Sequence, residues 1–307
     1  MKDNLVVEKR QRIQGVMLGL VVALIWGGYL AVSRHAIVDG FNEYELAFLR
    51  YASCSVVILP LWLFRCHQYF NRPQEQTLVI LLGRSLVLAA LAGPLFVIVG
   101  AGGYHYAPLA HGAVIQLGSV TLGSAILAAW CLNQRLGRSQ FFGLLILLAG
   151  LLSIAGPAIL EGGSNAWKGD LLFVFAGCLW SVFSTLLQRW KMTPITAVMA
   201  VSFLSTLSYG SWFLTVYGTS WLKHSWDALF EVVAVQGVAS GILAVYAYAR
   251  CVQLLGSANA ALFAALAPAC AMLLGVPLTG EWPTLGQWSG LIVVSMGLLI
   301  ALRKNSK

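Results

Sequence analysis

Long apolar stretches alternate with short polar segments along almost the whole chain. Ten of these stretches are each long enough to cross a bilayer, because a spanning helix needs roughly 20 mostly apolar residues. They lie near residues 15–33, 46–64, 77–99, 106–131, 140–160, 169–187, 195–217, 230–250, 257–279 and 284–302. The pattern predicts an all-α integral membrane protein with ten transmembrane helices.

The second five stretches repeat the first five. The aligned pairs are Gly15 with Gly169 and Trp26 with Trp180 at an offset of 154 residues, and Gly143 with Gly290 and Gly150 with Gly297 at an offset of 147 residues. Because five spans is an odd number, the second copy enters the membrane from the opposite side. We therefore expect two inverted five-helix repeats, residues 1–160 and residues 161–307.

Composition agrees with a membrane bundle and gives its orientation. Mean hydropathy is +0.80 and only 10% of residues are charged. With a cytoplasmic amino terminus and ten alternating spans, the cytoplasmic side receives Lys2, Lys9, Arg10, Arg12, Arg65, Arg72, Arg135, Arg138, Arg189, Lys191, Arg250, Arg303, Lys304 and Lys307. The outer side receives only Arg34, Lys168 and Lys223. The positive-inside rule thus places both termini in the cytoplasm, and the net charge of +8 needs no nucleic-acid partner.

Several short motifs occur in order in the two halves. They are Trp26-Gly27, Arg34, Leu46-Ala47-Phe48-Leu49-Arg50, Gly169-Asp170, Trp180, Ala264-Ala265-Leu266-Ala267-Pro268, Gly275, Glu281, Gly290 and Gly297. With these motifs the chain resembles EamA-type members of the drug/metabolite transporter superfamily over residues 15–302. One departure is that Thr121 and Gln134 stand where the family often has proline and glutamate.

The resemblance implies a secondary transporter in the inner (cytoplasmic) membrane that moves small metabolites by alternating access, more often as an exporter. Amino acids, amines and drug-like compounds are the expected substrates, and no cofactor or metal is expected. A central pocket is expected between spans one, three, four, six, eight and nine. The almost purely aliphatic spans five and ten are expected to face lipid or a second copy in a homodimer.

Polar and aromatic residues inside the spans are the candidates for binding a substrate. The expected substrate-binding residues are Trp26, Tyr29, Arg84, His111, Gln116, Trp180, Ser181, Ser184, Tyr246 and Tyr248. The tryptophans and Tyr29 would stack on an apolar part of the substrate, and the amide and hydroxyl groups would bond its polar part. The alternative role is helix packing, because small and hydroxyl residues let membrane helices approach closely.

A charged side chain inside a membrane span costs free energy, so its position indicates a partner or a ligand. Arg50 and Arg84 fall within spans two and three, where each would either reach the interface and a nearby partner or bind a substrate carboxylate. Glu45 is close enough in sequence to pair with Arg50. The acids all lie near span ends, so His111 is the one deep titratable candidate for proton coupling.

Three other function classes remain open at this point: a channel-like facilitator, an intramembrane enzyme and a non-transporting receptor or scaffold. A channel-like facilitator needs no particular filter sequence. An intramembrane enzyme needs a nucleophile and a base held together. Gly237-Val238-Ala239-Ser240-Gly241 loosely resembles an intramembrane serine protease motif, but it lacks the glycine two residues before the serine. Saturable uptake separates a carrier from a channel.

Overall fold

The structure is a computed structural model, and it describes residues 2–70, 75–107, 109–134, 137–161, 165–279 and 285–301. These residues are helical with short connections, and no strand occurs among them. The predicted all-α class is confirmed. Within the described residues, six helical runs are long and apolar enough to cross a membrane. They are Lys9–Val38, Ile80–His105, Gly112–Cys131, Ala166–Trp190, Pro194–Tyr217 and Trp226–Leu255.

The first half begins with two long helices and continues through broken ones. Its elements are α1 (Lys2–Val38), α2 (Glu43–Phe70), α3 (Glu75–Ala92), α4 (Pro94–Gly102), η1 (Gly103–His105), α5 (Leu109–His111), η2 (Gly112–Gln116), α6 (Leu117–Cys131) and α7 (Arg138–Glu161). Pro94 is the first residue of α4, because its ring would clash with the preceding turn if the helix continued through it. The carbonyl of Ala92, freed at this break, accepts a hydrogen bond from the Tyr51 hydroxyl at 2.7 Å.

The second half has a similar order. Its elements are α8 (Ala166–Trp190), α9 (Pro194–Ser205), η3 (Thr206–Gly210), α10 (Ser211–Tyr217), η4 (Ser220–Lys223), α11 (Trp226–Val232), η5 (Val233–Ala244), α12 (Val245–Leu255), α13 (Ser257–Leu262), η6 (Phe263–Leu266), α14 (Ala267–Thr279) and α15 (Leu285–Ala301). Within the described residues, each of the ten expected ranges overlaps one helix or a run of consecutive helices. Three of them coincide with shorter apolar helices, Arg138–Ser153, Ser257–Ala271 and Trp288–Ala301. The motif residue Glu281 lies outside the described residues.

Contacts in the two halves correspond in pairs. Helix α1 packs against α14, and α8 packs against α6. A Cβ placed on Gly27 would lie 2.6 Å from Cβ of Cys270, and one placed on Gly123 would lie 2.6 Å from Oγ of Ser181. The offsets found in the sequence relate Gly27 to Ser181 and Gly123 to Cys270. The two crossings are therefore copies of one contact, as a duplicated unit requires.

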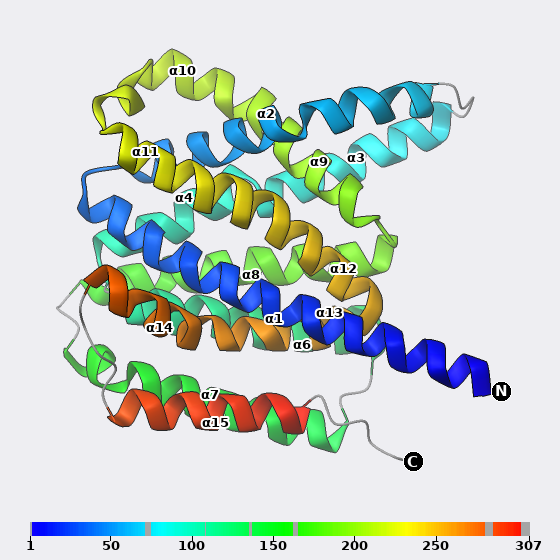
Figure 1. Ribbon diagram of the computed structural model, residues 1–307, viewed down its shortest axis with the longest axis vertical. Helices are drawn as coiled ribbons and strands as arrows, with labels where there is room; N and C mark the ends of the chain where they lie inside the picture. Colours follow the sequence, from blue (N-terminus) through cyan, green and yellow to red (C-terminus); the bar gives the residue numbers. More distant parts are fainter. Residues whose placement is uncertain are drawn as a thin grey trace.

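Helices α7 and α15 lie together at one edge of the bundle (Figure 1). A Cβ on Gly150 would lie 3.0 Å from the carbonyl oxygen of Gly290, and one on Gly297 would lie 2.9 Å from that of Gly143. Gly150 and Gly297 are repeat partners, and so are Gly143 and Gly290. The two contacts are therefore the same contact, seen once from each repeat. The same helices expose Leu285, Leu299 and Phe142, so their outer sides are strongly apolar.

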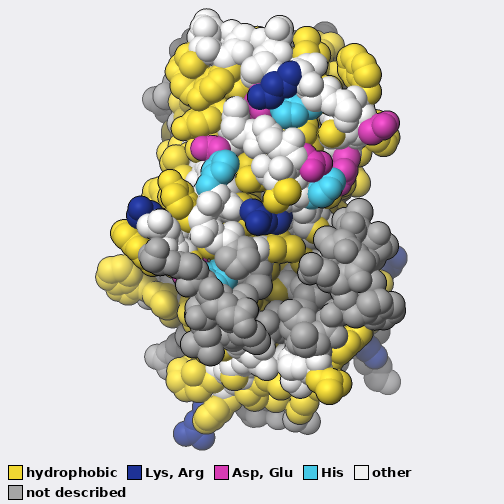
Figure 2. All heavy atoms as spheres, turned by 90° about the vertical axis from the view of Figure 1, so that its left-hand side faces the viewer, with side chains coloured by type: hydrophobic (Ala, Val, Ile, Leu, Met, Phe, Trp, Pro, Cys, Tyr) yellow, Lys and Arg dark blue, Asp and Glu magenta, His cyan; other side chains and the backbone are white. Residues whose placement is uncertain are grey.

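Both ends of the described chain lie on the same side of the bundle (Figure 1). The opposite side carries acids and histidines (Figure 2), which lie within 4 Å of one another in pairs. These pairs are His35 with Asp39 and Glu231, His105 with Glu43, and His224 with Glu45. Acids and histidines of the described residues therefore gather at the end opposite the chain termini.

Candidate functional site

A cavity lies where helices of the two halves meet, and its empty space is about 350 Å³, part of it open to the outside. Its lining comes from α1 (Trp26, Tyr29, Leu30), α2 (Arg50), α4 (Phe96), η2 and α6 (Gln116, Leu117, Val120), α8 (Trp180) and η5 (Ser240). The wall is mostly aromatic and aliphatic with a few polar groups. That combination is typical of small-molecule sites.

Two tryptophans from equivalent positions of the repeats form the centre of the wall. The rings of Trp26 and Trp180 meet edge to face, with centroids 5.2 Å apart and planes at 87°. Phe96 packs on Trp180 at 5.0 Å between centroids. Because Trp26 and Trp180 are repeat partners, this contact joins equivalent positions of the two repeats. The cavity therefore lies at the seam that the two halves share.

A second layer of side chains holds these rings in place. Tyr248 packs on Trp26 at 5.2 Å and on Trp180 at 5.6 Å between ring centroids. Its hydroxyl shares a 2.5 Å hydrogen bond with Oγ of Ser184. Ser184 also donates to the carbonyl of Trp180 at 2.9 Å, one turn back on α8. Tyr248 and Ser184 thus fix the orientation of the indoles from behind.

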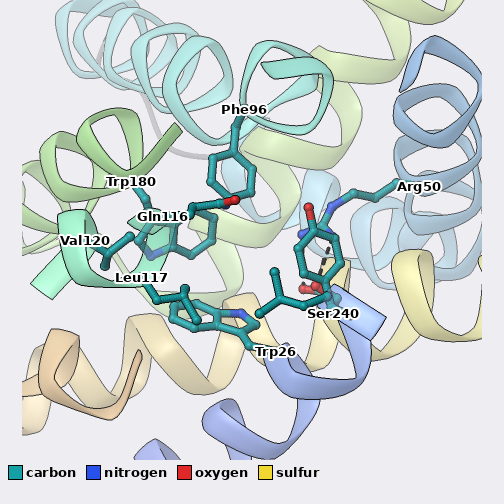
Figure 3. A pocket seen from close by; sticks show the side chains of 10 residues that line it. Trp26, Arg50, Phe96, Gln116, Leu117, Val120, Trp180 and Ser240 are labelled. Atoms are coloured by element: carbon teal, nitrogen blue, oxygen red, sulfur yellow. Dashed lines mark hydrogen bonds between the residues drawn. The ribbon is translucent and has the colours of Figure 1, made fainter. Parts of the chain in front are cut away.

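The polar end of the cavity is built around Arg50. Its side chain is only 2% exposed, and its guanidinium lies over the ring of Tyr29 at 5.1 Å. Nη1 donates to Oγ of Ser240 at 2.9 Å, and Nη2 reaches the Ser240 carbonyl at 3.4 Å. Figure 3 shows Arg50 beside Ser240, with Gln116, Phe96 and Trp180 across the cavity. The site has a cationic end and an aromatic end.

Irregular helical segments supply part of this wall. Gln116 ends the π-helical segment η2, and Ser240 lies within the π-helical segment η5. Phe96 lies in the first turn after the break at Gly93. Wide or interrupted turns are frequent at functional sites. In membrane proteins such backbone is tolerated where it is buried in protein or lines a cavity.

The sequence also matches a known protein family. The sequence pattern of the EamA-like transporter family matches residues 13–156 and, a second time, residues 167–303. The chain belongs to the EamA-like transporter family. It is accordingly a multi-pass membrane protein from a family that transports small molecules, and the two matches show a two-repeat architecture.

Solved structures confirm the fold of this EamA-like transporter. One of them, titled only as the crystal structure of a protein, has a TM-score of 0.69 and 17% sequence identity. The alignment covers 94% of this chain and 97% of that chain. No curated protein matches the sequence.

Four of the expected binding residues of this EamA-like transporter line the cavity: Trp26, Tyr29, Gln116 and Trp180. Tyr248 and Ser184 lie directly behind them. Ser181 instead donates to the carbonyls of Gly177 and Val120, at 2.8 and 3.1 Å, in the contact between α8 and α6. The side chain of Ser181 therefore serves helix packing in this structure.

The other three expected residues lie away from the cavity. Arg84 is half-buried on α3, and its guanidinium lies 5.5 Å from the ring of Trp190. Tyr246 is 46% exposed on α12. His111 is buried, and its Nδ1 lies 2.8 Å from Oδ1 of Asp170 on α8. His111 and Asp170 thus link the two repeats without lining the cavity.

The sequence did not point to Ser240 or Phe96 as binding residues, and for Arg50 it left carboxylate binding as one of two alternatives. The other alternative for Arg50 is a nearby partner, for which Glu45 is close enough in sequence. In the structure, Glu45 bonds instead to Ser220 on η4 at 2.7 Å. The signal in the sequence for this site was an arginine inside an apolar span. Its contact with Ser240 on a distant helix is visible only in the structure.

Proposed function

We propose that this protein is a secondary transporter of small organic metabolites, with the cavity between the two halves as its substrate site. The observation that carries the proposal is the contact of Trp26 with Trp180, because it puts equivalent residues of both repeats on one wall. Inverted repeats place a substrate site near the midplane at such a seam. Rocking of one half against the other would expose the cavity alternately to the two sides.

The proposed topology has ten membrane crossings, in repeats 1–160 and 161–307 related by a half-turn about an axis in the membrane plane. The paired contacts of α1 with α14 and α8 with α6 support this relation. The shared side of the two chain ends supports an even number of crossings (Figure 1). The distribution of Lys and Arg along the sequence supports cytoplasmic termini in an inner membrane, because the outer side receives only Arg34, Lys168 and Lys223.

We propose that transport is weakly coupled to protons unless His111 supplies the coupling. Its partner Asp170 is 29% exposed, whereas His111 is 1% exposed, so the pair connects a buried site to a more accessible one. Among the described residues, the cavity lining contains no acid. The check is uptake with and without an imposed pH gradient, for wild type and His111→Ala. Strong gradient-driven accumulation that survives the substitution would place coupling elsewhere.

The experiment that tests the function starts from purified protein. A thermal-shift screen against amino acids, amines, organic acids and drug-like compounds identifies ligands, because binding to the folded state raises the unfolding temperature. Each ligand is then offered to proteoliposomes and its initial uptake rate measured against concentration. A rate that saturates supports the carrier. A rate that rises in proportion to concentration supports a channel-like facilitator instead.

A further inference from the structure

Arg50 is a buried charge with no opposite charge beside it. No acidic group of the described residues lies within ion-pair distance of its guanidinium, although its side chain is 2% exposed. The rings of Tyr29 and Tyr51, at 5.1 and 5.7 Å, give partial compensation through their π faces. A buried charge without a partner is costly, so proteins usually pair it. The charge of Arg50 is therefore not neutralised by any acid among the described residues.

The hydrogen bonds of Arg50 are also incomplete. A guanidinium has five N–H donors. Nη1 has one short bond to Ser240 and a 3.5 Å contact with Oε1 of Gln236, while Nε has no hydrogen-bond partner. The amide of Gln236 is oriented by its own donation to Ser33 Oγ at 2.8 Å, which turns its oxygen toward Arg50. All the described acceptors are neutral, and donors remain for a ligand.

The rest of the cavity is uncharged and largely apolar. Trp26, Phe96 and Trp180 form the wall opposite the guanidinium (Figure 3). Gln116 adds the amide group on that side, and Leu117 and Val120 complete the lining. A ligand that fills this space therefore meets one positive charge at one end and aromatic faces at the other.

We propose that the cavity binds an organic carboxylate with an apolar or aromatic body, whose carboxylate is held by Arg50 and whose body lies among Trp26, Phe96 and Trp180. The inference rests on the proposed function and narrows its substrate class to anions, so that simple amine cations are excluded. A guanidinium fork matches a carboxylate geometrically. A cationic ligand would instead place a second positive charge in a site that has no acid in its lining.

The direct test uses three compounds of nearly equal shape: 3-phenylpropionate, its neutral amide 3-phenylpropionamide, and the cation 3-phenylpropylamine. Binding to purified wild-type protein is measured by calorimetry at pH 7.5. We expect the carboxylate to bind about tenfold or more tightly than the amide, because a hydrogen bond to a charged group is the stronger one. We expect the amine to bind most weakly. Equal binding of the amide or the amine, or binding of none of the three, would overturn the proposal.

Variants locate the effect at Arg50. Arg50→Gln should abolish the preference for the carboxylate, and Arg50→Lys should keep part of it, because lysine retains the charge without the fork. The matched control is Arg189→Gln, which removes the same charge from an exposed position on α8 and should change nothing. If folded Arg50→Gln protein keeps the wild-type preference, the assignment is wrong. If Arg50→Gln does not fold, the order of affinity of the three compounds for the wild-type protein still tests the proposal.

Binding and transport can fail separately in this design. Carboxylate-selective binding without any uptake into proteoliposomes would refute the transport function and leave the anion site standing. Saturable uptake of some other ligand, together with binding that ignores charge, would refute the anion site and leave the transport function standing.

Discussion

The smallest feature on which the proposed function depends is the edge-to-face pair of Trp26 and Trp180. Each ring is almost fully buried, and each is held from behind by Tyr248. Tyr248 is in turn fixed by Ser184. An aromatic surface with so little freedom is pre-organised for a flat or apolar ligand, because little side-chain entropy is lost on binding.

Replacing one of these rings should weaken substrate binding more than it weakens the fold. Trp180→Phe removes the indole but keeps an aromatic ring against Phe96. We expect the KM for transport to rise about two- to tenfold, the size of an aromatic pair contribution. The control is Trp130→Ala, since Trp130 is 82% exposed on α6 and away from the cavity. An unchanged KM in Trp180→Phe would show that this wall does not touch the substrate.

Glu45 organises the end of the bundle opposite the chain termini. Its carboxylate and the Asn42 side chain bond each other's backbone N–H groups, which caps α2. Ser220 and His224 also bond this carboxylate, at 2.7 and 3.1 Å. Burial raises the pKa of Glu45, but the hydrogen bonds from Ser220, Asn42 and His224 lower it by more, so the net pKa lies below its ordinary value.

The sign of that pKa shift predicts the pH dependence. A carboxylate with a lowered folded-state pKa stabilises the protein above the ordinary carboxyl pKa, and the stabilisation is lost as pH falls through the folded pKa. At pH 7, Glu45→Gln should lower the free energy of unfolding by about 1–3 kcal/mol. The difference from wild type should shrink below about pH 4. Thermal unfolding across this range is the measurement, with exposed Asp227→Asn as control; a gap that stays constant in acid would contradict this role for Glu45.

Arg50 and Arg84 show where sequence reasoning reaches its limit at this scale. Both are cations inside apolar spans, and the sequence marks them alike. The tertiary structure distinguishes them. Arg50 bonds to Ser240, which is 190 residues away in the sequence, whereas Arg84 lies over the ring of Trp190. The four cavity residues that were predicted, by contrast, share helical faces visible in the sequence. Local periodicity shows which face is polar but not which distant helix covers it.

At the scale of helices, close approach depends on single glycines. A Cβ on Gly27 would lie 2.7 Å from the backbone nitrogen of Ala271, so α1 and α14 cannot keep their spacing if a side chain is added there. At Gly28 the nearest atom is Cδ1 of Leu274 at 3.8 Å, an ordinary contact. Two adjacent glycines therefore differ sharply in what they tolerate.

Gly27→Ala and Gly28→Ala form a matched pair for testing the α1–α14 contact. We expect Gly27→Ala to destabilise the protein by about 1–3 kcal/mol, the usual cost of overpacking a close interface. Gly28→Ala should leave stability within about 0.5 kcal/mol of wild type. The unfolding temperature in detergent measures both. Equal effects of the two substitutions would mean that α1 and α14 do not cross as closely as described.

Helices α7 and α15 illustrate what a repeat in the sequence can and cannot reveal. The offset of 147 residues relates Gly143 to Gly290 and Gly150 to Gly297 from the sequence alone. It does not reveal that partners from the two copies contact each other, because an offset carries no information about the axis between the copies. The exposed apolar sides of these helices agree with the expectation that they face lipid or a second copy of the chain.

At the scale of the whole molecule, the number of crossings determines on which side each loop lies. Reporter fusions after Lys307 and within residues 161–168 should report opposite compartments, with the first in the cytoplasm. The reason is that an odd number of crossings separates the two fusion points. Fusions on the same side would refute both the ten crossings and the inverted arrangement of the two repeats.

The central claim is that the cavity at Trp26 and Trp180 opens alternately to the two sides of the membrane. Counterflow tests it most directly, using a ligand from the thermal-shift screen and proteoliposomes loaded with the unlabelled compound. Unlabelled ligand inside the vesicles competes with the labelled ligand for the inward-open site, so labelled ligand that has entered leaves slowly. We therefore predict transient accumulation of the labelled ligand above its outside concentration and a rate that saturates. Labelled ligand that only equilibrates, at the same rate in loaded and empty vesicles, would contradict alternating access.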